Sequence, residues 1–226
     1  MGTPGSGPAA PLLVACALRI EQAALRSGGR GARGGAPPGY AVLRTGMGPR
    51  AAERAVGRAL GEPGLSDAAV LATGFCAGLV PGMSPGDLIV AEETRDPRGT
   101  VACAGTALLA EALARAAPGR TVHIGVLTGS DHVVRGQERA QLRATGAIGV
   151  DMESAATLWT AAATRGGGVE PGAGRPVAAV RVIVDAPEHE LVRIGTVRGG
   201  ISAFRVLRAV LPAFYDWHRS LLLPRR

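Results

Sequence analysis

Two carboxylates, Asp151 and Glu153, stand where a short apolar run gives way to an Ala- and Leu-rich stretch. Residues 146–150 are typical of a strand end, and residues 154–164 are typical of a helix. In open α/β sheets ligands bind at the carboxyl ends of strands, so both acids are candidate binding residues. The alternative is that they only start a helix, where acids offset the positive end of the helix dipole.

Charged residues also follow two other predicted strands. The apolar run 11–17 predicts a buried parallel strand, and Arg19 and Glu21 come shortly after it. The Val-rich run 176–184 predicts a second buried strand, which ends in Asp185. A carboxyl at the end of a buried strand is costly unless it is paired or used, which makes Asp185 a candidate for chemistry. For Glu21 the competing interpretation is a solvated helix start.

Strand and helix signals alternate along the chain, which predicts an α/β fold with a sheet covered on both faces. Residues 1–10, rich in Gly and Pro, predict a disordered tail, and residues 11–226 predict a single domain. Residues 27–39 and 166–174 predict flexible loops. Further strands are expected at 40–45, 68–72, 85–93 and 122–127, and further helices at 22–26, 51–60, 104–116, 135–143 and 196–223, the last broken near Pro212.

The composition excludes several classes of protein. The chain has 226 residues and a net charge of +7, and all 25 of its basic residues are arginines. These arginines are spread without a basic run, so no nucleic-acid partner is predicted. Cys16, Cys76 and Cys103 form no CxxC pair, so neither a disulfide framework nor a metal site is expected. With no apolar run of about 18 residues and no signal peptide, a cytoplasmic protein without stable membrane insertion is predicted.

The sequence around the two acids is similar to a known family signature. Val150-Asp151-Met152-Glu153-Ser154-Ala155-Ala156 resembles the Val-Glu-Met-Glu-Ala-Ala signature of the nucleoside phosphorylase and nucleosidase superfamily. The resemblance implies a single-domain three-layer α/β/α fold with a central mixed, partly barrel-like sheet. It implies that Asp151, Met152 and Glu153 bind substrate, with Met152 against the ribose and Glu153 on the ribose hydroxyls.

The same resemblance leaves the nucleophile open. Glu21 falls where the nucleosidases carry the acid that activates the attacking water. Arg19 falls where bacterial hexameric phosphorylases hold phosphate, and Arg44 falls where a neighbouring subunit lends an Arg, with Thr73 as a further phosphate residue. Inorganic phosphate is therefore a possible co-substrate, no cofactor is implied, and a homo-oligomer is expected.

Two further loops resemble those of the nucleosidases. Residues 73–79 resemble the loop Thr-Gly-Ser-Ala-Gly-Gly-Leu, in which Gly74 lets the backbone approach the ligand. Phe75 replaces the Ser that contacts nucleophile or phosphate, which argues against standard phosphate binding and makes the pocket more apolar. Residues 128–134 resemble a loop whose aromatic residue stacks on the base, and His132 or Val133 takes that place.

The run that ends in Asp185 resembles the family stretch Val-Arg-Ala-Ile-Ser-Asp, which implies that Asp185 is the acid that protonates N7 of the leaving purine. The implied reaction is cleavage of the N-glycosidic bond of a 5′-substituted adenosine, with release of adenine. Within the superfamily the motifs look most like hopanoid-associated phosphorylases, which act on adenosylhopane, and next like methylthioadenosine/S-adenosylhomocysteine nucleosidases.

Two alternatives lie outside this reaction. Residues 46–51 match the G-x-G-x-x-A pattern of dinucleotide-binding oxidoreductases, although the next strand lacks the acid that this pattern needs. A non-catalytic nucleoside-binding relative is the other alternative.

Overall fold

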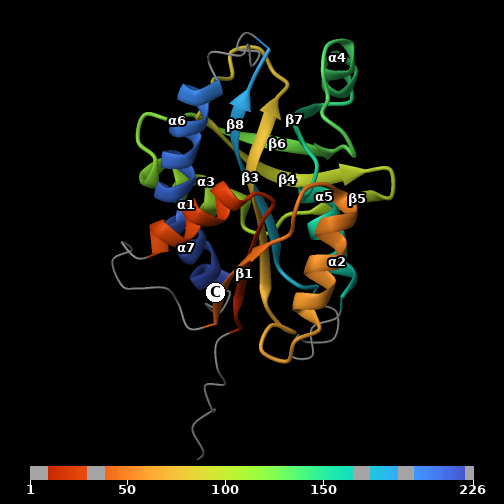
Figure 1. Cartoon of the computed structure of the whole chain (residues 1–226), viewed down its shortest axis with the longest axis vertical. Coiled ribbons are helices and arrows are strands. Elements are labelled where there is room, and N and C mark those ends of the chain that lie inside the picture. The colour runs from red at the N-terminus through yellow and green to blue at the C-terminus, as the bar shows by residue number, and fades with distance from the viewer. Residues whose placement is uncertain (1–9, 30–38, 165–173, 188–195, 222–226) are drawn as a thin grey trace, which may run out of the picture.

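The computed structural model describes residues 10–29, 39–164, 174–187 and 196–221 (Figure 1). Its strands form one eight-stranded sheet. The strands are β1 (Leu12–Cys16), β2 (Tyr40–Arg44), β3 (Ala69–Gly78), β4 (Leu88–Asp96), β5 (Gly99–Ala102), β6 (Val122–Gly129), β7 (Ala147–Asp151) and β8 (Val177–Asp185). The helices are α1 (Arg19–Gly29), α2 (Pro49–Leu60), α3 (Thr106–Ala116), α4 (Gln137–Ala144), α5 (Ser154–Ala163), α6 (Thr196–Ala209) and α7 (Leu211–Leu221).

Part of the sheet closes on itself. Strands β3, β8, β4, β6 and β7 pair in that order, and β7 returns to pair with β3. β1 extends the sheet from β3 and carries β2, while β5 pairs antiparallel with β4. Parallel and antiparallel pairs both occur, so the predicted mixed, partly barrel-like sheet is confirmed.

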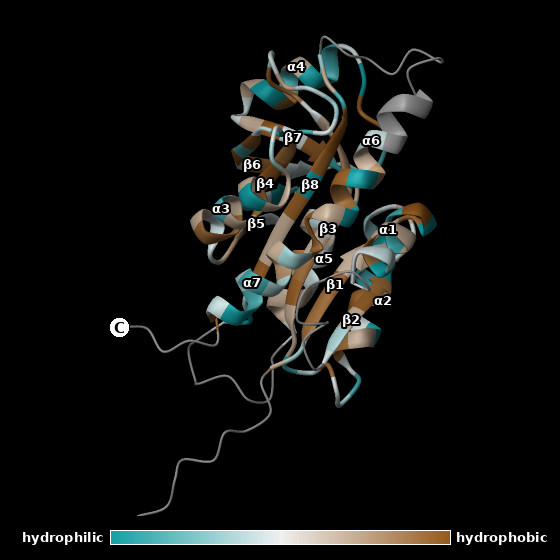
Figure 2. Cartoon of the chain, turned by 90° about the vertical axis from the view of Figure 1, so that its left-hand side faces the viewer, coloured by the Kyte–Doolittle hydropathy of each residue, from teal (hydrophilic) through white to brown (hydrophobic). Residues whose placement is uncertain are grey.

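Helices cover both faces of the sheet (Figure 1). α1, α3, α6 and α7 lie on one side, where the largest core cluster joins them to the apolar faces of β1, β3 and β8. α2 and α5 pack together on the other side over a second cluster. The strands between these layers are predominantly hydrophobic (Figure 2), because a sheet buried on both faces needs apolar side chains on both. The predicted three-layer α/β/α architecture is confirmed.

The structure corrects two expectations about the elements. Residues 73–78, expected in a loop, continue β3, because they pair with β8 on one side and at Ala77 and Gly78 with β7 on the other. The short, mostly exposed β5 was not predicted. The predicted break of the closing helix near Pro212 is confirmed: α6 ends at Ala209 and α7 begins at Leu211, with Pro212 in its first turn, where proline is tolerated.

Several expectations lie outside the described residues: nearly all of the predicted tail and most of the predicted loops 27–39 and 166–174. Within the described ranges no helix is long and apolar enough to cross a membrane.

Candidate active site

A cavity of about 230 Å³ lies where β3, β7 and β8 end. The residues that line it come from six separate stretches of chain. Eight of them are residues that the sequence predicted for the site: Glu21, Phe75, His132, Val133, Asp151, Met152, Glu153 and Asp185. The closed part of the sheet explains the convergence, because it brings the ends of strands distant in sequence to one place. The residues that the sequence predicted for a nucleoside site therefore line one common cavity.

A buried arginine, Arg181, interacts with the acids that line this cavity. It lies in the middle of β8, and its side chain is 1% exposed. The guanidinium forms an ion pair with Asp151, and it donates to Ser154 Oγ at 2.8 Å and to the Thr73 carbonyl at 2.9 Å. Burial opposes its charge, but the carboxylates of Asp151, Glu153 and Glu21 raise the pKa of Arg181 above its usual value.

Asp151 is the most fully engaged of these acids. Besides pairing with Arg181, it accepts hydrogen bonds from Ser154 Oγ at 2.6 Å and from the backbone N–H groups of Glu153 and Ser154 at 3.3 and 3.1 Å. These contacts fix the turn from β7 into α5, which carries Met152 and Glu153 into the cavity. Asp151 also lines the cavity, and its binding of substrate stays a prediction.

Glu21 is buried at the start of α1 and joins two elements. Its Oε2 accepts from the backbone N–H groups of Ala17 and Leu18 at 2.9 and 2.8 Å, as in a helix capping box. Its Oε1 accepts from the Phe75 N–H at 2.9 Å. Burial raises the pKa of Glu21, although Arg181 and the three N–H donors oppose the rise. Glu21 is thus a fixed carboxyl that holds a proton more readily than an exposed one.

Gly74 makes the approach of Glu21 and Arg181 possible. A Cβ at this position would lie 2.5 Å from Glu21 Oε1 and 2.6 Å from Arg181 Nη1, and its φ of +135° suits glycine alone. Gly74 therefore admits these two side chains; it is not among the residues that line the cavity, and its predicted approach to a ligand stays a prediction.

Glu153 is the N-cap residue of α5, but its side chain makes no capping bond to that helix. Instead, its Oε1 accepts from the backbone N–H of Gly48 at 2.8 Å, across 105 residues of sequence. Gly46 and Gly48 both have positive φ in the turn before α2, so the glycine pattern there forms a tight turn at the edge of the cavity. Burial raises the pKa of Glu153, with Arg181 opposing. The interpretation of Glu153 as a mere helix-start acid does not explain this orientation.

Asp185 ends β8 as predicted, but it does not stand alone in an apolar setting. It forms an ion pair with Arg139 of α4, whose Nε donates to the Val134 carbonyl at 3.2 Å. Both side chains line the cavity, and both are largely buried. Among the described residues, Arg139 Nη1 and Asp185 Oδ1 have no hydrogen-bond partner.

His132 and Met152 separate this cavity from a second one of about 660 Å³, because both residues line both cavities. His132 is exposed, and its ring nitrogens contact Asp131 at 2.7 Å and Glu138 at 3.0 Å. The hydrogen bond to Asp131, followed by Glu138, raises the pKa of His132. Val133, the other residue expected at the base, is 63% exposed at the cavity rim.

The structure does not bring the three predicted phosphate residues together at the cavity. Arg19 and Arg44 are exposed and do not line it. Thr73 is fully buried in β3, and its carbonyl accepts from Arg181. Their binding of phosphate stays a prediction.

Other chemistries find no support at this site. Burial raises the pKa of the Cys76 thiol far above its ordinary value, which leaves it protonated and a poor nucleophile. Across the described ranges, no group of three or more His, Cys, Asp or Glu side chains could hold a metal ion.

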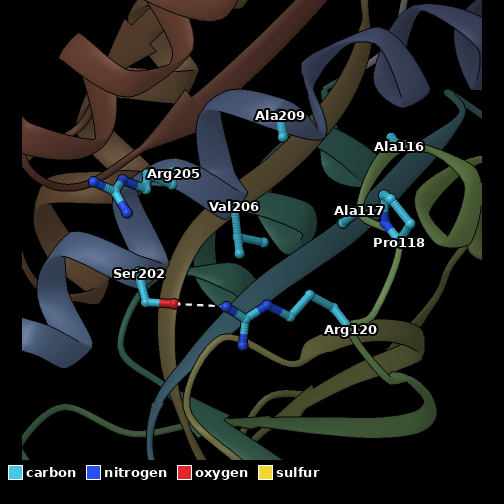
Figure 3. Close-up of a pocket in the computed structure, with 8 residues that line it drawn as sticks. All are labelled: Ala116, Ala117, Pro118, Arg120, Ser202, Arg205, Val206 and Ala209. Carbon is cyan, nitrogen blue, oxygen red and sulfur yellow. Dashed lines mark hydrogen bonds between the residues drawn. The ribbon is translucent and has the colours of Figure 1, made fainter.

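A third cavity of about 440 Å³ lies apart from these residues, between the C-terminal end of α3 and α6 (Figure 3). Arg120 crosses it and donates to Ser202 Oγ at 2.9 Å. None of the predicted site residues lines it, and the described residues of its lining include no carboxylate.

Two residues of the site, Arg181 and Arg139, were not singled out from the sequence. Arg181 had a signal, because it is the single charge inside the Val-rich run 176–184 and a buried charge needs partners. No feature of the sequence distinguishes Arg139, because it is one of three arginines in residues 135–143 and only the fold brings it to Asp185.

Solved structures similar to this one include nucleosidases. A methylthioadenosine/S-adenosylhomocysteine nucleosidase from Neisseria meningitidis has a TM-score of 0.72 at 20% identity, covering 92% of this chain and 99% of that chain. The Helicobacter pylori enzyme, with 5′-methylthioadenosine in its active site, has a TM-score of 0.71 at 16% identity, covering 91% and 98%. An S-adenosylhomocysteine nucleosidase from Streptococcus pyogenes has a TM-score of 0.70 at 18% identity, covering 94% and 98%. At these identities the likeness shows the fold.

The family of this chain is shown by a match of its sequence to a family model. No curated protein matches the chain. The family model of the phosphorylase superfamily matches residues 3–212, nearly the whole chain, which speaks against the dinucleotide-binding oxidoreductase alternative. The chain therefore belongs to the phosphorylase superfamily, and the predicted class of nucleoside phosphorylase or nucleosidase is confirmed.

Proposed function

We propose that this protein cleaves the N-glycosidic bond of a 5′-substituted adenosine and releases adenine. One observation carries the proposal: a single cavity gathers Glu21, Met152, Glu153 and Asp185, four residues with separate tasks in that reaction. Cleavage develops positive charge on the ribose and negative charge on the base. Carboxylates at the ribose side and a base-contacting group at the other side therefore stabilise the transition state.

Each residue has a part in the proposed reaction. Glu153 accepts hydrogen bonds from the ribose hydroxyls and Met152 packs against the sugar, which holds C1′ in place. Glu21 takes a proton from the nucleophile as it attacks C1′. The electron pair of the broken bond passes to the purine, which takes up a proton at N7, and Asp185 on the cavity wall is the residue proposed to deliver it.

Water is the proposed nucleophile. Glu21 is a buried carboxyl on the cavity wall, whereas Arg19, Arg44 and Thr73 do not meet there. Phosphorolysis is the alternative, and it would require Arg44 to act in a neighbouring copy of the proposed homo-oligomer.

An apolar 5′ substituent fits the rim of the cavity. At about 230 Å³ the cavity is smaller than most ligand pockets, so a large substituent must extend beyond it. Met47 and Val133 line the cavity and are 71% and 63% exposed, and Phe75 adds apolar surface inside. These side chains favour an alkylthio or a lipid group at the 5′ position, and adenosylhopane is one substrate of that kind. The three free cysteines are consistent with the proposed cytoplasmic location.

Base release tests the proposal. The protein would be incubated with adenosine, methylthioadenosine and a 5′-alkyl adenosine, with and without phosphate, and adenine would be measured by chromatography. We expect adenine in phosphate-free buffer and the fastest release from the apolar 5′ substrates. Strict dependence on phosphate would replace water with phosphate as nucleophile. No base from any substrate, with the protein folded, would leave the non-catalytic nucleoside-binding alternative.

A further inference from the structure

The cavity between the C-terminal end of α3 and α6 has a polar end and an apolar end (Figure 3). Arg120 and Ser202 meet at the polar end, whereas residues 116–118 and Val206 and Ala209 of α6 supply apolar walls. Ser202, Val206 and Ala209 follow one another at i, i+4 and i+7, so they share one helix face about 10 Å long. At about 440 Å³ the cavity has the size of a small-molecule site, and its polarity fits a ligand with a polar head and an apolar tail.

Arg120 is held in place at the polar end. Its Nη2 donates to Ser202 Oγ at 2.9 Å, and its Nη1 donates to the Pro85 carbonyl at 3.4 Å. Gly86 leaves the room that the guanidinium needs, because a Cβ there would lie 2.7 Å from Arg120 Nη1, and the φ of +94° at this position favours glycine. A guanidinium fixed by these contacts loses little further freedom when a ligand binds to it.

The charge of Arg120 is not neutralised within the described part of the chain. No described carboxylate forms an ion pair with it. A guanidinium has five N–H donors, and the two bonds above leave Nε without a partner among these residues. Arg120 is only partly buried, and Nε is not among the buried unpaired atoms, so it is accessible to solvent in the residue that crosses the cavity.

A single cation faces the polar end. Arg205 also lines the cavity, but Figure 3 shows its side chain extending away from Arg120. A carboxylate matches one planar guanidinium in charge and geometry, whereas a phosphate dianion would lack a second cation. The Ser202 hydroxyl, which accepts from Arg120, has its own proton to donate to the same anion.

We propose that this cavity binds an aliphatic monocarboxylate. Its carboxylate accepts hydrogen bonds from Arg120 and Ser202, and its chain lies along Val206 towards Ala209. The site is separate from the candidate active site, since none of the residues that line the one cavity lines the other. The inference therefore does not depend on the proposed function.

Calorimetric titration of the whole protein tests the proposed site, with octanoate as the probe. Octanol keeps the chain without the charge, and acetate keeps the charge without the chain. We expect octanoate to bind about 10- to 100-fold more tightly than octanol, because charge-assisted hydrogen bonds are lost in the alcohol. Acetate should bind at least about 10-fold more weakly than octanoate, because it buries almost no apolar surface. Failure of the folded parent to bind octanoate at millimolar concentration, or equal affinity for octanoate and octanol, would overturn the proposal.

Variants place the bound octanoate in this cavity. Arg120→Gln should lower the affinity for octanoate to that for octanol, and Arg120→Lys should retain part of the difference. Ala209→Trp puts a large side chain at an exposed position of the apolar end and should abolish binding of both probes. Arg115→Gln, an exposed change on α3 outside the cavity lining, is the matched control and should change neither affinity.

Unchanged octanoate affinity in folded Arg120→Gln and Ala209→Trp would show that the probe binds elsewhere and would also overturn the proposal. If Arg120→Gln does not fold, Arg120→Lys and Ala209→Trp carry the comparison. Adenine release is measured separately, so a protein that releases adenine but binds no octanoate contradicts only this inference.

Discussion

At the scale of single residues, the site concentrates buried carboxyls around one buried guanidinium. Glu21, Asp151 and Glu153 all interact with Arg181, so the cluster carries more acids than bases when ionised. Such a cluster stabilises positive charge, and the charge that develops on a ribose during cleavage is positive. Burial raises the pKa of Glu21 and of Glu153, so the charge of the cluster depends on pH.

The raised pKa of Glu21 predicts the acid side of the pH–rate profile. A general base must be ionised, so kcat/KM should fall as the pH drops through a pKa above the ordinary 4.5 of a glutamate. Glu21→Gln removes the base and should lower kcat by about 10²–10⁴-fold. Rates measured from pH 4 to 9 check this. A variant with the parent's rate and profile would remove Glu21 from the reaction.

At the scale of elements, the junctions of β3, β7 and β8 hold the cluster together. Arg181 of β8 contacts the β7–α5 turn through Asp151 and β3 through the Thr73 carbonyl. Glycine in β3 admits these side chains, and the β7–α5 turn orients Met152 and Glu153. The site therefore depends on strand ends that are far apart in sequence.

Gly74→Ala tests how closely Glu21 and Arg181 pack against β3. The new Cβ would overlap Glu21 Oε1 and Arg181 Nη1 at a backbone conformation that disfavours side chains. We expect a loss of about 1–3 kcal/mol in the free energy of unfolding, together with a loss of activity. Gly64→Ala is the control, since nothing lies within 4 Å of its Cβ, and it should change stability by less than about 0.5 kcal/mol. A Gly74→Ala protein as stable and active as this control would contradict the packing described.

Arg181→Met tests the buried ion pair. Removing the guanidinium leaves Asp151 buried without its cation, which should cost about 3–5 kcal/mol in urea denaturation. Adding Asp151→Asn to this variant should recover part of the loss, because the uncompensated charge is gone. Strictly additive losses in the double variant would show that the two residues do not interact.

At the scale of the whole molecule, folding stability should report the same buried acids. A carboxyl with a raised folded-state pKa stabilises the protein below its unfolded pKa, and this contribution is lost as the pH rises through the folded pKa. Glu21 therefore makes the parent less stable as the pH rises from 4.5 towards neutrality. Glu21→Gln lacks this effect, so its stability relative to the parent should increase over that range. Urea denaturation at pH 4, 5.5 and 7 measures the difference, and a constant difference would contradict the burial argument.

Most strands and several site residues could be predicted from the sequence, whereas contacts between segments that are distant in sequence could not. Apolar runs followed by charged residues predicted β1, β7 and β8, with Asp151 and Asp185 at the ends of two of them and Glu21 shortly after the first, because buried strands leave a pattern in the chain. The continuation of β3 through Gly74 could not be predicted, since its pairing partners come from β7 and β8, distant in sequence. The same holds for the contact of Arg139 with Asp185 and for that of Glu153 with Gly48.

The measurement that tests the central claim most directly compares Glu153→Gln with the parent on a ribonucleoside and on its 2′-deoxy analogue. If Glu153 binds the ribose hydroxyls, the variant loses a charge-assisted hydrogen bond of about 1.5–3 kcal/mol. That corresponds to roughly a 10- to 150-fold loss in kcat/KM on the ribonucleoside. The loss should be much smaller on the deoxy substrate, which already lacks a partner hydroxyl. Equal fractional losses on both substrates would show that Glu153 does not contact that hydroxyl and would contradict the assignment of this cavity.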